Sequence, residues 1–407
     1  MQGRIRYARE FLSWMGLLVF LLKLGARRQV RFELDSPAAL ENLNRLCDRQ
    51  HPTLAHSDTL EHFLGHVPPG AYHGLRRRMV QRLLRMKVLD EGRLFGHVLI
   101  VIDGTGQLTF RQRHCPHCLE QTVGGQKRYY HSVLEAKLVT PTGLALSVGS
   151  EFIANRDPHA TKQDCELKAF QRLAERLHQD FPQLRLCLCL DGLYANGTVL
   201  EICEQHQWKY LITFKEGSLP AVWQEYQTLR DLTPRNGLVR QPPHGPQQTF
   251  AWVQNLEYRD DQDRPHRFHA FQCQEPAGAT RRFFAWLTNF TLRAENVAAL
   301  ANRGGRLRWK IENEGFNLQK NGGFALEHAY STRPETIQNW YLLLQIAHLI
   351  LQLLERGNLL GQEARRLFGS FRNLAKRLAE SFRNQLIPAE ILDPHACRAL
   401  QIRLNSS

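Results

Sequence analysis

The spacing of apolar residues changes near residue 96, and this change predicts the main division of the chain. Before it, apolar residues recur at helical spacing, most clearly in 74–88, where arginines fill the other positions. After it, short apolar runs typical of strands alternate with amphipathic stretches typical of helices. The expected strands are 96–102, 129–139, 143–153, 184–190 and 210–214, and the expected helices between them are 162–179 and 196–206. We therefore expect an α/β core whose elements follow in the order β-β-β-α-β-α-β.

The segment after this core has a different composition and predicts an inserted, β-rich unit. Residues 216–280 are rich in Pro, Gly, Gln and charge, and two of their runs alternate between apolar and polar residues as strands do, namely 249–253 and 267–273. A more regular run at 282–288 is expected to form a further strand. Helical spacing returns afterwards. The predicted parts are a helical region 1–95, a core 96–215 completed by 291–330, the insertion 216–290, and a helical region 331–407.

Two stretches are apolar on more than one helical face. Residues 335–356 contain enough polar residues to predict a buried helix and not a membrane span. Residues 11–22 follow three arginines and imitate a signal peptide, but they are too short to span a bilayer and basic residues follow at once. We expect both to be core helices or dimer contacts, with no membrane association. Residues 363–384 predict a basic amphipathic helix.

The charge of the chain indicates a polyanionic partner. Its 407 residues carry a net charge of +14, and lysine and arginine bind phosphates with release of counterions. Arg77, Arg78 and Arg82 on the predicted helix 74–88 are candidates for contacts with DNA phosphates. A solvated face explains such a basic helix equally well.

The cysteines indicate a reducing compartment. There are nine, and Cys187 and Cys189 lie inside an apolar run, a pattern typical of buried free thiols. Cys115 and Cys118 form a CxxC pair, flanked by two histidines. No second CxxC follows, so this pair indicates a zinc site only weakly.

Three carboxylates stand where strands and a helix are expected to present them. Asp103 follows the strand 96–102, Asp191 follows the strand 184–190, and Glu312 lies on a predicted helix. Mg²⁺ favours carboxylates together with substrate phosphates, and two such ions can clamp the attacking and leaving oxygens of a phosphodiester. A lone aspartate after a strand is often only a turn residue. The three acids together predict a two-metal site for phosphodiester chemistry.

The order of the elements and the positions of these acids resemble the RNase H-like fold of DDE transposases and integrases. The segment Arg308-x3-Glu312, with Trp309 and Ile311, resembles the third-carboxylate helix of cut-and-paste insertion-sequence transposases. That helix carries Tyr-x2-Arg-x3-Glu-x6-Lys. A β insertion before the glutamate is also seen in that group.

Two positions of the segment differ from the family pattern. Gly305 stands at the tyrosine position, and Lys320 lies one residue beyond the lysine position. A second acid, Glu314, competes for the metal role. Helical geometry puts Arg308 and Glu312 on one face and Glu314 about half a turn away, which favours Glu312.

The resemblance implies a fold, an activity and ligands. The fold is an RNase H-like mixed sheet flanked by helices, with the β subdomain inserted before Glu312. The activity is metal-dependent cleavage at the ends of a DNA element and strand transfer to target DNA. Asp103, Asp191 and Glu312 would hold two Mg²⁺ or Mn²⁺ ions. The partners would be double-stranded DNA and a second copy of the chain, as a homodimer on DNA in the cytoplasm, associated with the nucleoid.

Single residues have alternative roles under this interpretation. Arg308 would contact a DNA phosphate or pair with Glu312, and Lys320 is a further candidate for DNA binding. Trp286 would stack on a flipped base or belong to the core. Two other functions remain open, an RNase H-like nuclease that cuts without joining and a domesticated DNA-binding protein without catalysis. No phosphate-binding GxxxxGK[ST] loop occurs, so ATP hydrolysis is not indicated.

Overall fold

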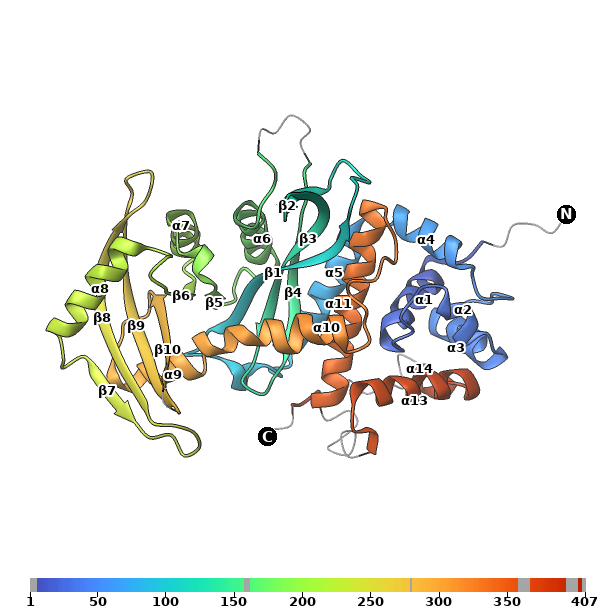
Figure 1. Cartoon of the computed structure of the whole chain (residues 1–407). Coiled ribbons are helices and arrows are strands. Elements are labelled where there is room, and N and C mark those ends of the chain that lie inside the picture. The colour runs from blue at the N-terminus through green and yellow to red at the C-terminus, as the bar shows by residue number, and fades with distance from the viewer. Residues whose placement is uncertain (1–5, 157–161, 279, 358–366, 393–401, 405–407) are drawn as a thin grey trace.

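The computed structural model of the chain describes residues 6–156, 162–278, 280–357, 367–392 and 402–404. It is an α/β protein built on one mixed sheet, as the sequence predicts. Figure 1 shows the sheet crossing the molecule from the insertion at one end to a helical region at the other. Helices from both ends of the chain meet in that helical region.

The sheet has ten strands in the order β2-β3-β1-β5-β6-β10-β9-β8-β7, with β4 paired to β3. Their bounds are β1 (Val98–Phe110), β2 (Leu119–Val123), β3 (Gln126–Val139), β4 (Ala145–Ile153), β5 (Leu186–Leu190), β6 (Lys209–Thr213), β7 (Gly237–Arg240), β8 (Gln248–Arg259), β9 (Pro265–Ala277) and β10 (Thr280–Thr288). Every residue of β4 and β5 is buried, which confirms that the apolar run 184–190 predicts a strand covered on both faces.

The described helices are α1 (Arg9–Leu21), α2 (Gln29–Leu34), α3 (Pro37–Cys47), α4 (Ser57–His66), α5 (Pro69–Arg85), α6 (Glu166–Asp180), α7 (Gly197–Gln205), α8 (Pro220–Leu232), α9 (Ala294–Asn302), α10 (Leu318–Asn321), α11 (Pro334–Arg356), α13 (Phe371–Asn384) and α14 (Ala389–Leu392). Short 3-10 helices are η1 (Asp90–Gly92), η2 (Gly192–Tyr194) and η3 (Gly305–Arg308), and η4 (Ile311–Asn317) is a π-helix. The first residues of the predicted helix 363–384 lie outside the described residues.

The first core strand is longer than its apolar run predicts. The prediction ended it at residue 102, whereas β1 continues to Phe110 because it pairs with β3 from Ile100↔Leu138 to Phe110↔Tyr129. Backbone pairing extends a strand past the point where its side chains stop being apolar. A further strand, β2, was not predicted. It is exposed and polar, and it folds back on β3 through a turn at Gly124 and Gly125.

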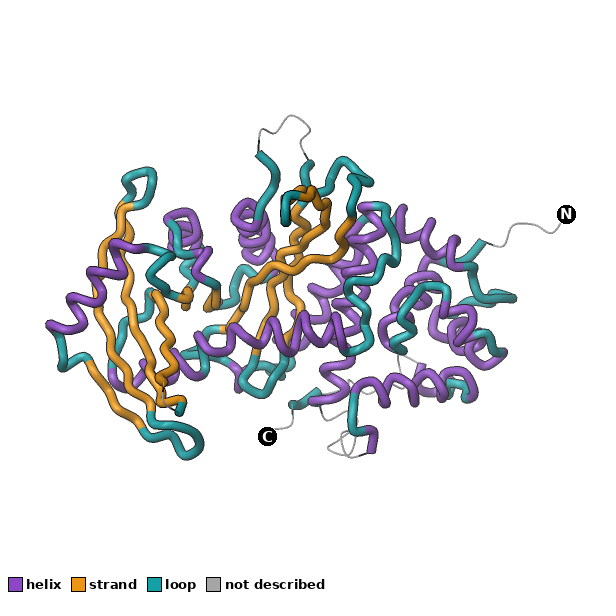
Figure 2. The backbone as a smooth tube through the Cα atoms, in the orientation of Figure 1, coloured by secondary structure: helices purple, strands orange, loops and turns teal. Residues whose placement is uncertain are grey.

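The insertion is a continuation of the core sheet. Its predicted strands are confirmed within β8, β9 and β10, and β10 pairs antiparallel with core strand β6. Helix α8 was not predicted and packs on β8. Figure 2 shows the long strands of the insertion running side by side at one end of the molecule. A shared sheet gives the insertion a fixed orientation toward the core.

Helix α11 holds the helical region to the sheet. It packs against α1, α4, α5 and strand β4, and α13 packs against α2 and α3 (Figure 1). Among the described helices, α11 alone is long and apolar enough to cross a membrane by length and composition. However, 83% of its most apolar 18-residue stretch is buried inside the protein. The prediction that α1 and α11 are core helices is confirmed.

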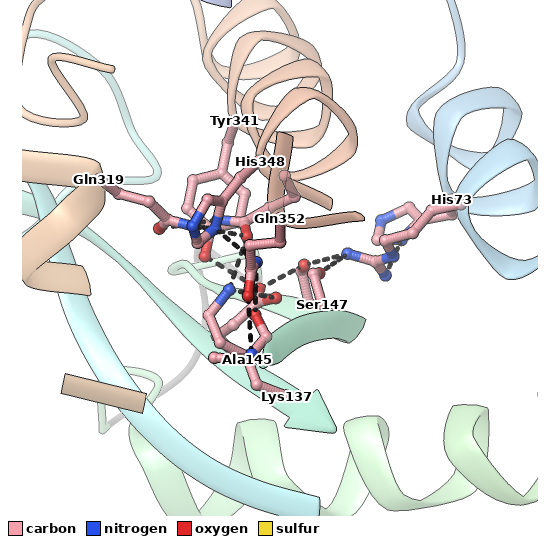
Figure 3. Close-up of polar contacts among 12 residues, drawn as sticks. His73, Lys137, Ala145, Ser147, Gln319, Tyr341, His348 and Gln352 are labelled. Atoms are coloured by element: carbon pink, nitrogen blue, oxygen red, sulfur yellow. Dashed lines mark hydrogen bonds and ion pairs between the residues drawn. The ribbon is translucent and has the colours of Figure 1, made fainter. Parts of the chain in front are cut away.

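Buried polar side chains connect α11 and α5 to the sheet (Figure 3). Lys137 of β3 donates to Gln345 at 2.8 Å, and Tyr341 donates to Glu135 at 2.9 Å. Arg76, which is 2% exposed, donates to two serines of β4. Burial of charges costs free energy unless they are paired and hydrogen-bonded, so these contacts compensate one another.

This network predicts a large difference between two arginines of α5. Arg76→Met should lower the free energy of unfolding by about 3–5 kcal/mol, because it removes one of the two cations near buried Glu135 and the hydrogen-bond donor of Ser147 and Ser150. Arg78→Met, an exposed residue on the same helix, should change it by less than about 0.5 kcal/mol. Urea unfolding followed by circular dichroism measures both. Equal midpoints for the two variants would contradict the prediction.

Candidate functional site

Asp103 and Asp191 lie next to each other because of the register between β1 and β5. The two strands are parallel, and the last pair in their ladder is Val101↔Cys189. Two residues further along each strand are Asp103 and Asp191, so both side chains point to the same face. Neighbouring strands are about 4.8 Å apart, which brings the two carboxylates within reach of shared ligands.

The third carboxylate comes from η4, which packs on β1, β3 and β4. Buried Ile311 and Phe316 hold this π-helix on the sheet. The close approach requires Gly315, since a Cβ there would lie 3.0 Å from the Lys137 side chain. Glu312 thereby lies near enough to Asp103 to raise the pKa of that carboxyl. The spacing of the residues predicted an ordinary helix here, and it did not predict the wider π-helix η4. Helical turns of the π type are frequent at functional sites.

Arg308 forms an ion pair with one of these acids. Its Nη1 is 3.2 Å from Oδ2 of Asp103. The sequence offered Glu312 as the structural partner of Arg308, and this pairing is wrong: the ion pair is with Asp103. The guanidinium of Arg308 also lies 5.0 Å from the ring centre of Trp309, which is 57% exposed.

The electrostatics of Asp103 show that negative charge is concentrated here. Burial, together with the neighbouring charge of Glu312, raises its pKa to about 7 against the opposing effect of Arg308. Burial disfavours the ionised form, and a second carboxylate adds repulsion. A bound cation would relieve both effects.

A fourth acid, Glu166 in the first turn of α6, lies beside Asp103 although its sequence pattern is that of an ordinary helix start. Gly104 follows Asp103, and a Cβ there would lie 2.3 Å from a carboxylate oxygen of Glu166. Tyr194 donates to Glu166 at 3.3 Å. Burial, and then the charge of Asp191, raise the pKa of Glu166. The glycine after Asp103 was the signal in the sequence, because only a residue without a side chain leaves room for this acid.

The donors in this cluster suit a hard divalent cation. Oδ1 of Asp191 is a buried oxygen without a hydrogen bond among the described residues, and Lys215 lies 3.8 Å from it. Asp103, Glu312 and Glu166 supply further carboxylate oxygens, which are the ligands that Mg²⁺ and Mn²⁺ prefer. An unsatisfied buried oxygen in an acidic cluster is consistent with a cation as its missing partner.

Other predicted site residues are engaged elsewhere. Lys320 pairs with Glu327 at 2.9 Å, and Glu314 pairs with Lys310 at 2.8 Å. Of Glu312 and Glu314, Glu312 is the one whose charge raises the pKa of Asp103. Arg77 pairs with Asp180 at 3.0 Å.

Trp286 belongs to the core. It is 3% exposed and stacks on Phe271 with ring centres 5.1 Å apart. A Cβ at Gly305 would lie 2.2 Å from its indole nitrogen, so the chain covers the ring closely. Of its two predicted roles, the core role is confirmed, and stacking on a base is excluded in this conformation because no base can reach the ring.

A scan against protein-family models and a search of curated proteins found no match to this chain.

The raised pKa of Asp103 predicts a pH-dependent affinity for Mn²⁺. Below about pH 7 a proton occupies this carboxylate and competes with the metal, so the affinity should rise about tenfold per pH unit up to pH 7 and then level off. Electron paramagnetic resonance of free Mn²⁺ in a titration measures it. Asp103→Asn should bind weakly and lose this dependence. A wild-type affinity that does not change between pH 5.5 and 7 would contradict the prediction.

Proposed function

We propose that the protein is a DDE-type DNA transposase that hydrolyses phosphodiesters at element ends and transfers the strand to target DNA. The observation that carries the proposal is the convergence of Asp103, Asp191 and Glu312, which are far apart in the sequence and come from three different elements. The resemblance of the Arg308–Glu312 segment to insertion-sequence transposases supplies the reaction class.

The sheet supports an RNase H-like core. Strands β4, β3 and β1 are successive antiparallel neighbours, β5 pairs parallel with β1, and β6 pairs parallel with β5. This is the arrangement expected of that fold, with Asp103 within β1 and Asp191 directly after β5. The insertion and the two helical regions surround this core.

The side chains have separate roles in the proposed reaction. The three carboxylates would hold the metal ions, and Glu166 would add negative charge beside them. Two bound divalent ions would activate the attacking oxygen and stabilise the leaving one. Arg308 would release Asp103 to the metal and bind a phosphate oxygen, since a guanidinium forms bidentate contacts with phosphate.

DNA contact outside the site would come from exposed basic residues. Arg78 and Arg82 are exposed on α5, and the whole chain carries a net charge of +14. Two element ends must be held together for transposition, so we also propose a homodimer on DNA. Because α1 and α11 bury most of their apolar residues inside one chain, the dimer contact would use other surfaces.

Strand cleavage tests the assignment directly. Full-length protein with Mg²⁺ should nick a duplex that carries the sequence flanking its gene. Asp191→Asn and Glu312→Gln should each slow cleavage at least about 100-fold, because each removes a metal ligand worth several kcal/mol in the transition state. Glu166→Gln should slow it about tenfold, since this acid lies beside the ligands.

Glu314→Gln is the matched control for Glu312→Gln, because it changes a neighbouring acid that pairs with Lys310. It should retain activity within about threefold. Full activity of Glu312→Gln would refute the assignment. Cleavage without joined products, scored on a labelled target duplex, would instead favour an RNase H-like nuclease.

Salt dependence of DNA binding tests the basic helix. Arg78→Ala combined with Arg82→Ala should weaken binding to all duplexes alike and lower the slope of log affinity against log salt by about 2. Arg77→Ala should change the slope less, because Arg77 already pairs with Asp180. Fluorescence anisotropy at several salt concentrations measures these slopes. An unchanged slope in the double variant would place the DNA contact elsewhere.

A further inference from the structure

Four side chains outside the acidic cluster converge on one point of the β1–β3 ribbon. His114, Cys115 and Cys118 come from the connection between β1 and β2, and His131 comes from β3. One ligand atom from each residue lies within 4.8 Å of those of the other three. Cys118 is fully buried and His131 is 7% exposed. The CxxC pair is therefore completed by a histidine that is distant in sequence.

The separations between these atoms match a tetrahedral metal site. The two sulfurs are 3.4 Å apart, and Nε2 of His131 is 3.5 Å from the sulfur of Cys115 and 3.7 Å from that of Cys118. On His114, Nδ1 lies 3.3 Å from the sulfur of Cys118 and Nε2 lies 3.3 Å from Nε2 of His131, and one of these two nitrogens would bind the metal. Zinc bonds of about 2.3 Å to sulfur and 2.0 Å to nitrogen place tetrahedral ligands about 3.3–3.8 Å apart.

Neighbouring groups hold the ligands in this arrangement. The Cys118 amide donates to the Cys115 carbonyl at 3.4 Å, which closes the turn between the two sulfurs. Asn155 donates to the Cys118 carbonyl at 3.0 Å, and the flanking His117 bonds to the Asn155 carbonyl instead of joining the cluster. Hydrogen bonds of this kind orient the ligands of metal sites.

We propose that His114, Cys115, Cys118 and His131 bind one structural zinc ion. Two thiolates and two imidazoles form the donor set that selects zinc, whereas the acidic cluster offers the oxygen ligands of Mg²⁺. Four protein ligands leave no open position, so the ion would have a structural role. It would clamp the β1–β2 connection to β3, which pairs with the strand that carries Asp103. The proposal is independent of the proposed enzymatic function.

Metal analysis of the full-length protein tests the site. Reduced wild-type protein is titrated with zinc, and excess zinc is removed by gel filtration in a buffer that contains Mg²⁺. The protein should then retain about one zinc per chain. Cys115→Ser, Cys118→Ser and His131→Ala should each lower zinc retention at least about tenfold. Cys165→Ser, an exposed cysteine outside the cluster, and His117→Ala should retain it. Wild-type protein without zinc, or cysteine variants that keep it, would overturn the proposal.

Cobalt substitution provides a test that does not depend on the folding of any variant. Co²⁺ added to metal-free wild-type protein should give the visible bands of tetrahedral cobalt together with thiolate-to-cobalt charge transfer, and zinc should abolish both. A spectrum of octahedral cobalt without charge transfer would refute the site. The site would also be refuted if Cys115 and Cys118 of freshly reduced protein formed a disulfide with each other and bound no cobalt.

Discussion

The parallel pairing of β1 with β5 is the constraint on which the site depends. A shift of one residue in that register would turn Asp103 or Asp191 to the opposite face, because side chains alternate along a strand. The register is fixed from both sides, since β1 also pairs antiparallel with β3 over most of its length. The apolar residues that precede each aspartate are buried, so hydrophobic burial sets the position of the two charges.

Buried charges make the attachment of the helical region specific. Glu135 and Lys137 are both fully buried, and each finds partners on α11 as well as a counter-charge at 3.7 Å. Apolar packing alone would tolerate several orientations of an apolar helix on a sheet. Charges that lose their partners when the helix moves select one orientation. Gln345 of the same helix also accepts a hydrogen bond from Gln319 of α10, the helix that follows η4.

The sequence predicts those features that depend on apolar periodicity, and it misses those that depend on tertiary contact. The core strands, α6, α7 and the buried α11 follow from spacing. The extension of β1 past Asp103, the exposed strand β2 and the π-helix η4 depend on pairing and packing partners that spacing does not reveal. Glu166 had the appearance of an ordinary first-turn acid, and His131 that of a strand residue. Only the fold brings them to Gly104 and to Cys118.

The packing of α1 against α11 has a consequence for synthesis of the chain. The two helices are separated by roughly 300 residues, which a ribosome translating about 5–20 residues per second adds in about 15–60 s. During this interval the apolar residues of α1, among them Phe11 and Phe20, lack the surface that finally covers them. Helix α1 is thus made long before it is fully covered, and the nascent chain exposes an aggregation-prone segment until α11 emerges.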